Sequence, residues 1–313
     1  MNGQSKMRVV SLIASGTEIV HGIGRGDWLV GRSHECDYPA EVNQLPQITE
    51  PKFSTQGSSR DIDDRVREVL ETGLSVYSVD ADKLRALRPD VIVTQDQCEV
   101  CAVTLKDVEQ AVCGWMSESV KIVSLRPEGL EEVWCDITRV AEALICSDRG
   151  ENLIAQMRAR MTEIKETAES SCGRPTIACI EWIDPLMAAA NWMPSLVEMA
   201  GGENLFGEAG KHSPYIDWDD LVAADPEVII VLPCGFVMSR VVKEARHLQA
   251  QSGWNDLRAV RGGRVFVTDG HQFFNRPGPR LVESLEILAE ILHPELFNFG
   301  HRDRAWAPLK TAC

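Results

Sequence analysis

Two stretches of this chain, DKLRALRPDVIV at residues 82–93 and DDLVAADPEVII at residues 219–230, align with each other without a gap. In each, a short segment with helical spacing leads through Pro-Asp or Pro-Glu into a run of β-branched apolar residues. That order is typical of a helix followed by a buried parallel strand. The match therefore predicts an internal repeat, built from two similar α/β lobes.

Other patterns extend this interpretation. A second pair of matching positions is Ile23-Gly24 and Ala200-Gly201, which lie 177 residues apart, whereas the two stretches quoted above lie 137 residues apart. The first half of the chain therefore carries additional residues between Gly24 and Asp82. Buried-strand patterns occupy residues 9–14, 28–31, 75–79, 91–94, 120–125 and 176–181. Ser15 and Glu18 have the spacing of a capping box and predict a helix over residues 17–22.

The middle of the chain predicts one long helix. Residues 128–171 contain almost no Gly or Pro, and from Glu151 onward apolar residues recur at helical spacing. We expect an N-terminal α/β lobe at 1–146, a connecting helix at 147–172, a C-terminal α/β lobe at 173–292 and a tail at 293–313. The predicted fold class is α/β, with two Rossmann-like lobes joined by a long backbone helix. Since ligands of open α/β sheets bind beyond the carboxyl ends of the strands, we expect a ligand cleft between the lobes.

Composition narrows the class of function. The 313 residues include 32 Lys and Arg against 47 Asp and Glu, a net charge of −15, which disfavours a nucleic-acid binder. No segment is apolar enough to predict a transmembrane helix. The start of the chain has no apolar signal-peptide core, and ten cysteines are too few for a disulfide scaffold of this length. These features predict a cytoplasmic location, or a periplasmic one if an export signal has been trimmed.

Several motifs together resemble a known family. They are Ser11-Leu12 with Gly16-Thr17-Glu18, Cys36-Asp37-Tyr38-Pro39, Pro89-Asp90-Val91-Ile92, Gly201-Gly202-Glu203-Asn204 and the segment FFNRPGPR at 273–280. Over roughly residues 7–292 the chain resembles the helical-backbone class of ABC-transporter solute-binding proteins. The most similar subgroup is the periplasmic cobalamin-binding proteins, which are related to siderophore and haem binders.

The resemblance implies a non-enzymatic protein that holds a bulky metal chelate between aromatic side chains. The matching ligand-binding positions are Glu35, Tyr215, Phe273, Phe274 and Arg276, with Asn191 and Trp192 close by. It also implies docking on an ABC permease through Asp82 and Asp219, although the family usually has Glu there. The chain departs from the family in roughly two dozen additional residues around 54–80.

A Cys/His set forms the sharpest local motif. His34, Cys36, Cys98 and Cys101 each follow a predicted strand of the first lobe, and their side chains suit tetrahedral zinc or a similar soft metal. The alternatives are a thiol–disulfide pair and buried structural residues. The tryptophans 182, 192, 218 and 254 fit either a core or a ligand site.

The most specific function that the sequence predicts is binding of a corrinoid, with no required cofactor. His34 or His271 is a candidate axial ligand of the cobalt. The alternatives are a ferric siderophore or haem-like ligand, and a cytosolic Cys/His metal-binding or redox protein on the same scaffold. The chain contains no P-loop and no Gly-x-Ser-x-Gly motif, so we do not expect an enzyme.

Overall fold

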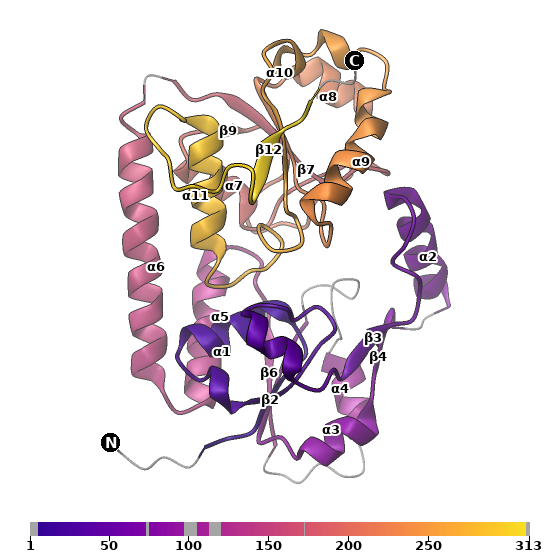
Figure 1. Ribbon diagram of the computed structural model, residues 1–313, viewed down its shortest axis with the longest axis vertical. Coiled ribbons are helices and arrows are strands. Elements are labelled where there is room, and N and C mark those ends of the chain that lie inside the picture. The colour runs from indigo at the N-terminus through magenta and orange to yellow at the C-terminus, as the bar shows by residue number, and fades with distance from the viewer. Residues whose placement is uncertain (1–5, 73–74, 97–104, 113–119, 172, 311–313) are drawn as a thin grey trace. The chain divides into compact units, whose positions relative to one another are not determined.

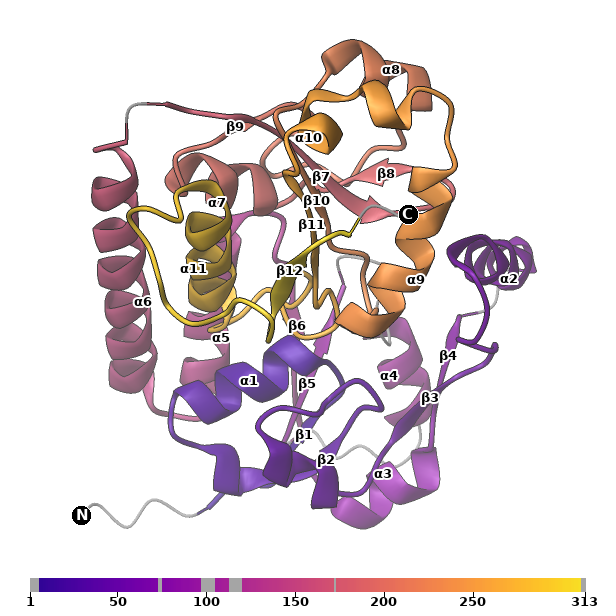
Figure 2. The same ribbon diagram turned by 45° about the horizontal axis from the view of Figure 1, so that its top comes forward.

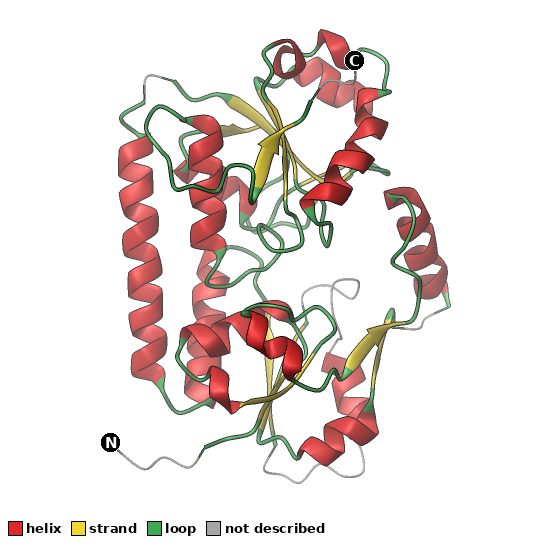
Figure 3. Ribbon diagram, in the orientation of Figure 1, coloured by secondary structure: helices red, strands yellow, loops and turns green. Residues whose placement is uncertain are grey.

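The computed structural model describes residues 6–72, 75–96, 105–112, 120–171 and 173–310 (Figure 1). The chain forms two compact units. Unit 1 contains most of residues 1–156, and unit 2 contains residues 157–313 together with the short segments 57–63 and 128–130. Each unit is an α/β structure with helices flanking its strands (Figure 3), so the predicted fold class is confirmed.

The core of unit 1 is a four-stranded parallel sheet in the order β2-β1-β5-β6. Its strands are β1 (Val9–Ser11), β2 (Leu29–Arg32), β5 (Val91–Gln95) and β6 (Lys121–Leu125). The accompanying helices are α1 (Ala14–Gly22), α3 (Ala81–Leu87), α4 (Leu105–Val112) and α5 (Leu130–Ala143), with short 3₁₀ helices at Gly26–Trp28 and Ala40–Gln44. All five residues of β5 are buried, as expected of a central parallel strand.

The region around the additional residues 54–80 forms a separate ribbon and a helix. Strands β3 (Thr49–Pro51) and β4 (Tyr77–Val79) pair antiparallel, apart from the main sheet. Helix α2 (Ser59–Glu71) lies between them in the chain. The additional residues therefore do not interrupt the parallel sheet of unit 1, and residues 57–63 among them belong to unit 2.

The predicted long helix is α6 (Ser147–Ala168), which has 22 residues. It runs from unit 1 into unit 2, because the division between the units falls after Gln156. Met157, Met161 and Ile164, three of the apolar residues that predicted it, are buried.

Unit 2 contains a six-stranded sheet in the order β12-β11-β10-β7-β8, with β9 paired to β7 (Figure 2). The strands are β7 (Thr176–Trp182), β8 (Met187–Ala188), β9 (Glu203–Asn204), β10 (Val228–Val231), β11 (Val265–Thr268) and β12 (Trp306–Pro308). The helices are α7 (Met193–Met199), α8 (Trp218–Ala224), α9 (Met238–Gln249), α10 (Arg258–Arg261) and α11 (Leu281–Leu292), with a 3₁₀ helix at Trp254–Asp256. β12 and β8 run antiparallel, whereas β11, β10, β7 and β9 are parallel.

The predicted repeat appears in the structure residue by residue. Helices α3 and α8 each have seven residues and lie 137 positions apart, and each leads directly into a buried parallel strand. Both end at a residue in the left-handed conformation, Arg88 (φ 43°) and Asp225 (φ 40°). Gly24 and Gly201, the second matching pair, likewise share a positive φ just after α1 and α7.

The predicted capping box is wrong. Helix α1 begins at Ala14, directly after an extended Ile13, and no side chain caps it. Ser15 and Glu18 therefore lie inside the helix, where both are buried. The N-cap position is occupied by Ile13, whose side chain has no hydrogen-bond acceptor.

Candidate ligand-binding site

In unit 2, residues 269–280 form the loop that joins β11 to α11, and we call it the aromatic loop. Its backbone is held close to the loop that follows β10. The Asn275 side-chain amide donates to the carbonyl oxygens of Leu232 (3.0 Å) and Gly270 (2.9 Å). A Cβ atom on Gly270 would lie 2.1 Å from the Pro233 carbonyl oxygen, so only glycine fits there. The loop is thereby fixed beyond the carboxyl ends of β10 and β11, the usual ligand edge of such a sheet.

Two predicted site residues are joined inside this unit. The Trp192 indole N–H donates to the Phe274 carbonyl oxygen at 2.7 Å, and both side chains are buried. Phe274 adopts φ 68°, a conformation that a bulky residue rarely takes, and its N–H donates to the Ser284 hydroxyl (3.0 Å). These two bonds stabilise the unusual backbone at Phe274.

Phe273 is the more accessible of the two loop phenylalanines, with 9 % of its surface exposed. The Arg280 guanidinium lies over its ring, 4.4 Å from the centroid, and the His301 ring meets it edge-on at 6.4 Å. The ring is therefore contacted both by the start of α11 and by the C-terminal segment of the chain.

His271 and Arg276 form a polar pair in the same loop. The Arg276 Nη2 atom lies 3.1 Å from His271 Nε2. Because a guanidinium only donates, His271 Nε2 accepts this bond. The loop thus places an imidazole, an arginine and an aromatic ring within one short segment.

Sequence reasoning missed an aromatic–cation stack in unit 2. Trp182, at the end of β7, packs edge-on against Phe236 with ring centroids 5.2 Å apart, and the Arg240 guanidinium lies 3.7 Å from the Phe236 centroid. Burial lowers the pKa of Arg240 below its usual value. The Trp182 indole N–H is buried without an acceptor among the described residues. Trp182 was recognisable from its place at a strand end, whereas Phe236 and Arg240 belong to no pattern in the sequence.

Asn191 and Tyr215 lie along a short ladder near β8. Asn191 has φ 54°, and its N–H donates to the Lys211 carbonyl oxygen (2.9 Å). Tyr215 forms an isolated bridge with Met187 and is 56 % exposed. Asn191 adjoins Trp192 in the chain, so the ladder is connected to the aromatic loop through that tryptophan.

In unit 1, His34 lies between the main sheet and the β3–β4 ribbon. Its Nδ1 atom is 2.8 Å from the Thr49 hydroxyl, and its ring packs against Tyr77 with centroids 5.1 Å apart. Its Nε2 atom lies 3.4 Å from the Glu35 carboxylate. The imidazole is therefore oriented from the ribbon side, with Glu35 beside its second nitrogen.

Cys36 is fully buried among hydroxyl groups. Its sulfur lies 3.0 Å from the Thr17 hydroxyl and 3.2 Å from the Ser33 hydroxyl. The other two predicted metal ligands, Cys98 and Cys101, lie outside the described residues. Within residues that the structure describes, no group of three or more His, Cys, Asp or Glu side chains is arranged to hold a metal.

The two predicted docking residues occupy equivalent places. Asp82 lies in the first turn of α3 and Asp219 in the first turn of α8, and both are exposed. The repeat thus presents one carboxylate at the same position of each unit.

Comparison with known proteins identifies the family. The model of the periplasmic binding protein family matches residues 9–271. The chain is a periplasmic binding protein. This match covers the parallel strands of both units and extends into the aromatic loop.

Two relatives illustrate the family. An ABC transporter substrate-binding lipoprotein of Bacillus subtilis is 22 % identical over 295 residues, covering 93 % of this chain and 81 % of that protein. A vitamin B12-binding protein of Vibrio parahaemolyticus is 22 % identical over 292 residues, covering 89 % and 86 %. The resemblance to cobalamin-binding relatives is therefore confirmed.

Solved structures share the fold. A periplasmic haem-binding protein from Pseudomonas aeruginosa superposes with a TM-score of 0.72 at 20 % identity, covering 98 % of this chain and 99 % of that one. The periplasmic vitamin B12-binding protein of Vibrio cholerae gives 0.64 at 19 % identity, covering 91 % and 96 %. At these identities the likeness establishes the fold alone.

The predicted cytoplasmic location is wrong. The family is one of periplasmic binding proteins, and the relatives include a lipoprotein and periplasmic proteins, which indicate a place outside the cytoplasm. The N-terminal sequence and the cysteine content therefore misled the prediction of location. The comparisons give no support for zinc. Among the described residues, no helix has the length and hydropathy to cross a bilayer.

Proposed function

We propose that this periplasmic binding protein binds a corrinoid and delivers it to an ABC permease, without any covalent step. Two facts support the proposal: relatives that are named vitamin B12-binding proteins, and the composition of the aromatic loop. A corrinoid has a flat macrocycle bordered by amides and carries one phosphate. Binding it requires apolar contact area with a few directed donors.

The observation that carries the proposal is the grouping of Phe273, His271 and Arg276 beyond β11. Phe273 supplies an aromatic ring, which suits the edge or face of a macrocycle. Arg276 supplies charged donors that suit a phosphate or an amide oxygen. His271 adds an imidazole whose Nε2 atom lies 3.1 Å from Arg276 Nη2, so the two polar side chains stand together beside the aromatic ring.

Haem, or a ferric siderophore, is the second candidate. It is favoured by solved structures of the same fold that are named haem-binding proteins. The Arg276 guanidinium can pair with the propionate groups of haem as readily as with the phosphate of a corrinoid. We rank it second because several proteins related by sequence are named vitamin B12-binding proteins, whereas the haem-binding proteins enter through likeness of fold.

Calorimetric titration with cyanocobalamin, hemin and ferrichrome tests the proposal. We expect heat and a raised Tm with cyanocobalamin. The Arg276→Gln variant should bind about tenfold or more weakly because it loses charged donors. Arg304→Ala, which removes an exposed arginine of the C-terminal segment, is the matched control and should bind as wild type does.

The outcomes separate the candidates. Absence of heat and of any Tm shift at about 100 μM cyanocobalamin removes the corrinoid, since a useful ligand stabilises the native state. Binding of hemin or ferrichrome alone assigns the second candidate instead. The absorption spectrum with aquocobalamin should change if an imidazole replaces the axial water, and comparison of His34→Ala with His271→Ala shows which one does so.

A further inference from the structure

The C-terminal segment, residues 293–310, folds back along unit 2, and we call it the C-terminal arm. Its strand β12 pairs antiparallel with β11, the strand that leads into the aromatic loop. The first residue of that loop, Asp269, donates its N–H to the carbonyl oxygen of Ala305 in the arm (2.8 Å). The arm therefore runs beside the aromatic loop from the point where the loop begins.

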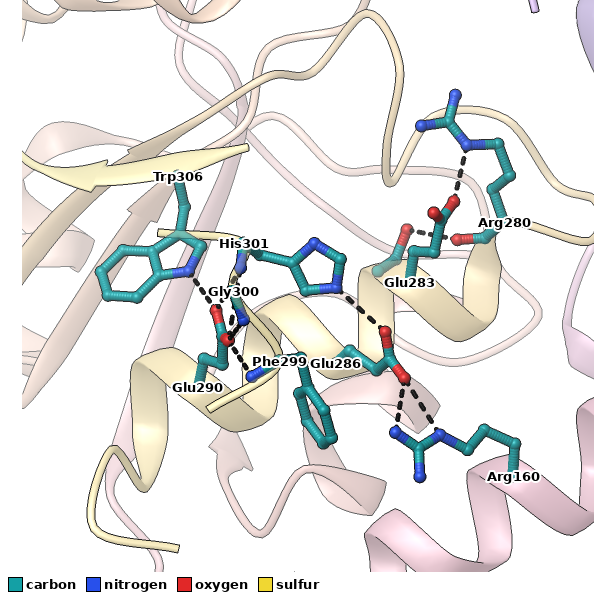
Figure 4. Close-up of polar contacts among 10 residues, drawn as sticks. Arg160, Arg280, Glu283, Glu286, Glu290, Phe299, Gly300, His301 and Trp306 are labelled. Atoms are coloured by element: carbon teal, nitrogen blue, oxygen red, sulfur yellow. Dashed lines mark hydrogen bonds and ion pairs between the residues drawn. The ribbon is translucent and has the colours of Figure 1, made fainter. Parts of the chain in front are cut away.

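A buried carboxylate on α11 anchors the arm. Glu290 is 3 % exposed and accepts hydrogen bonds from the backbone N–H groups of Phe299, Gly300 (2.6 Å) and His301 (3.2 Å). It also accepts from the Trp306 indole N–H at 2.8 Å (Figure 4). A buried charge is tolerated only when it is this well satisfied, so the arm is held in one place.

A second carboxylate orients His301. Glu286 accepts from Arg160 of α6 through one oxygen (2.7 and 3.0 Å) and from His301 Nε2 through the other (2.9 Å) (Figure 4). Burial raises the pKa of Glu286, but the hydrogen bonds from His301 and Arg160 outweigh it, and the pKa lies below its usual value. Glu286 is therefore ionised at neutral pH, and the His301 ring is fixed by a charge-assisted bond.

The oriented His301 ring contacts the aromatic loop at Phe273. It meets Phe273 at a centroid distance of 6.4 Å and an interplanar angle of 64°, an edge-to-face arrangement that favours one ring position. Arg280 lies over the same ring at 4.4 Å. The position of Phe273 is thus set by two neighbours, one at the last residue of the loop and one on the arm.

We propose that the C-terminal arm is a positioning element of the ligand site, in which His301 holds Phe273 in place for the bound chelate. The effect on affinity rests on the proposed function, whereas the order of the loop does not depend on any ligand. The chain Arg160–Glu286–His301–Phe273 connects the backbone helix α6 with the aromatic loop entirely inside unit 2. The match to the family model ends at residue 271, before Phe273 and the arm.

Hydrogen–deuterium exchange of the ligand-free protein tests the positioning directly. In His301→Ala, the amides of residues 271–276 should exchange about threefold to tenfold faster than in wild type, because Phe273 loses one of the two side chains that contact its ring. His301→Phe keeps a ring against Phe273 and should restore slow exchange. Arg304→Ala, three residues away in the arm and exposed, should leave the exchange unchanged. His301→Leu, which fills the same volume without an aromatic edge, replaces the alanine variant if that variant does not fold.

Titration with cyanocobalamin and hemin then connects the loop to binding. We expect weaker binding by His301→Ala, recovery in His301→Phe and no change in Arg304→Ala. Unchanged exchange in His301→Ala and His301→Leu would overturn the proposal, and so would faster exchange with unchanged affinity. If wild type binds neither probe while exchange responds as expected, the proposed ligands are wrong and the arm's hold on the loop is supported.

Discussion

At the scale of single residues, the aromatic loop uses its side chains to fix its own backbone. Trp192 and Phe274 are 82 positions apart, yet the indole N–H of one bonds the carbonyl oxygen of the other. Both rings are buried, and Phe274 keeps a positive φ that its hydrogen bonds support. Contact of either ring with ligand stays a prediction. What the geometry supports directly is that this pair stabilises the loop from which Phe273 and Arg276 extend.

Replacing Trp192 with Phe should therefore destabilise unit 2. The substitution keeps most of the ring volume but leaves the buried Phe274 carbonyl oxygen without its donor. The expected loss in the free energy of unfolding is about 1–3 kcal/mol. Urea denaturation followed by circular dichroism measures it. Trp218→Phe is the matched control, because its indole N–H also donates to a carbonyl oxygen, that of Ser252, but at an exposed site, and its cost should be smaller. Equal losses in both variants would contradict this role for Trp192.

At the scale of elements, the repeat was predictable because it depends on local patterns. The sequence of α3 with β5 matches that of α8 with β10, and helical spacing followed by a β-branched run determines both without tertiary information. The role of His301 was not predictable, because it depends on how the arm folds back onto α11. The capping box failed for a similar reason: the spacing of Ser15 and Glu18 fits, but the strand ends at Ser11 and the helix begins already at Ala14, before Ser15.

The left-handed ends of α3 and α8 allow a paired stability test. Arg88 has φ 43°, is exposed and makes no side-chain hydrogen bond or ion pair with another described residue, so Arg88→Gly should raise the free energy of unfolding by about 1 kcal/mol. Asp225 has almost the same conformation, but its carboxylate accepts from the Arg258 backbone N–H (2.7 Å) and pairs with its guanidinium (3.1 Å). Asp225→Gly loses these bonds and should not raise the free energy of unfolding. Chemical denaturation of both variants measures the difference, and a destabilised Arg88→Gly would refute the strain argument.

At the scale of the whole molecule, the repeat gives each unit the same small helix with the same exposed carboxylate. Asp82 and Asp219 both follow the first residue of a seven-residue helix that precedes a central strand. Neither lies in the aromatic loop or in the aromatic–cation stack. A receptor that delivers its ligand to a permease needs contacts outside the ligand site, and a pair of repeat-related acids suits that need. We therefore propose these two residues for docking, separately from ligand binding.

Charge reversal at both positions tests this separation. The double variant Asp82→Lys, Asp219→Lys should bind cyanocobalamin with the wild-type Kd, because neither residue belongs to the proposed ligand site. Uptake of labelled cobalamin should fall by about tenfold or more in cells that carry the variant in place of the natural protein, since two ion pairs with the permease become repulsive. Asp220→Lys, an equally exposed carboxylate one residue further along α8, is the control and should keep most uptake. If the double variant supports as much uptake as Asp220→Lys does, the proposal that Asp82 and Asp219 dock on the permease is refuted. If the double variant binds cobalamin more weakly in solution, its carboxylates contribute to the ligand site instead.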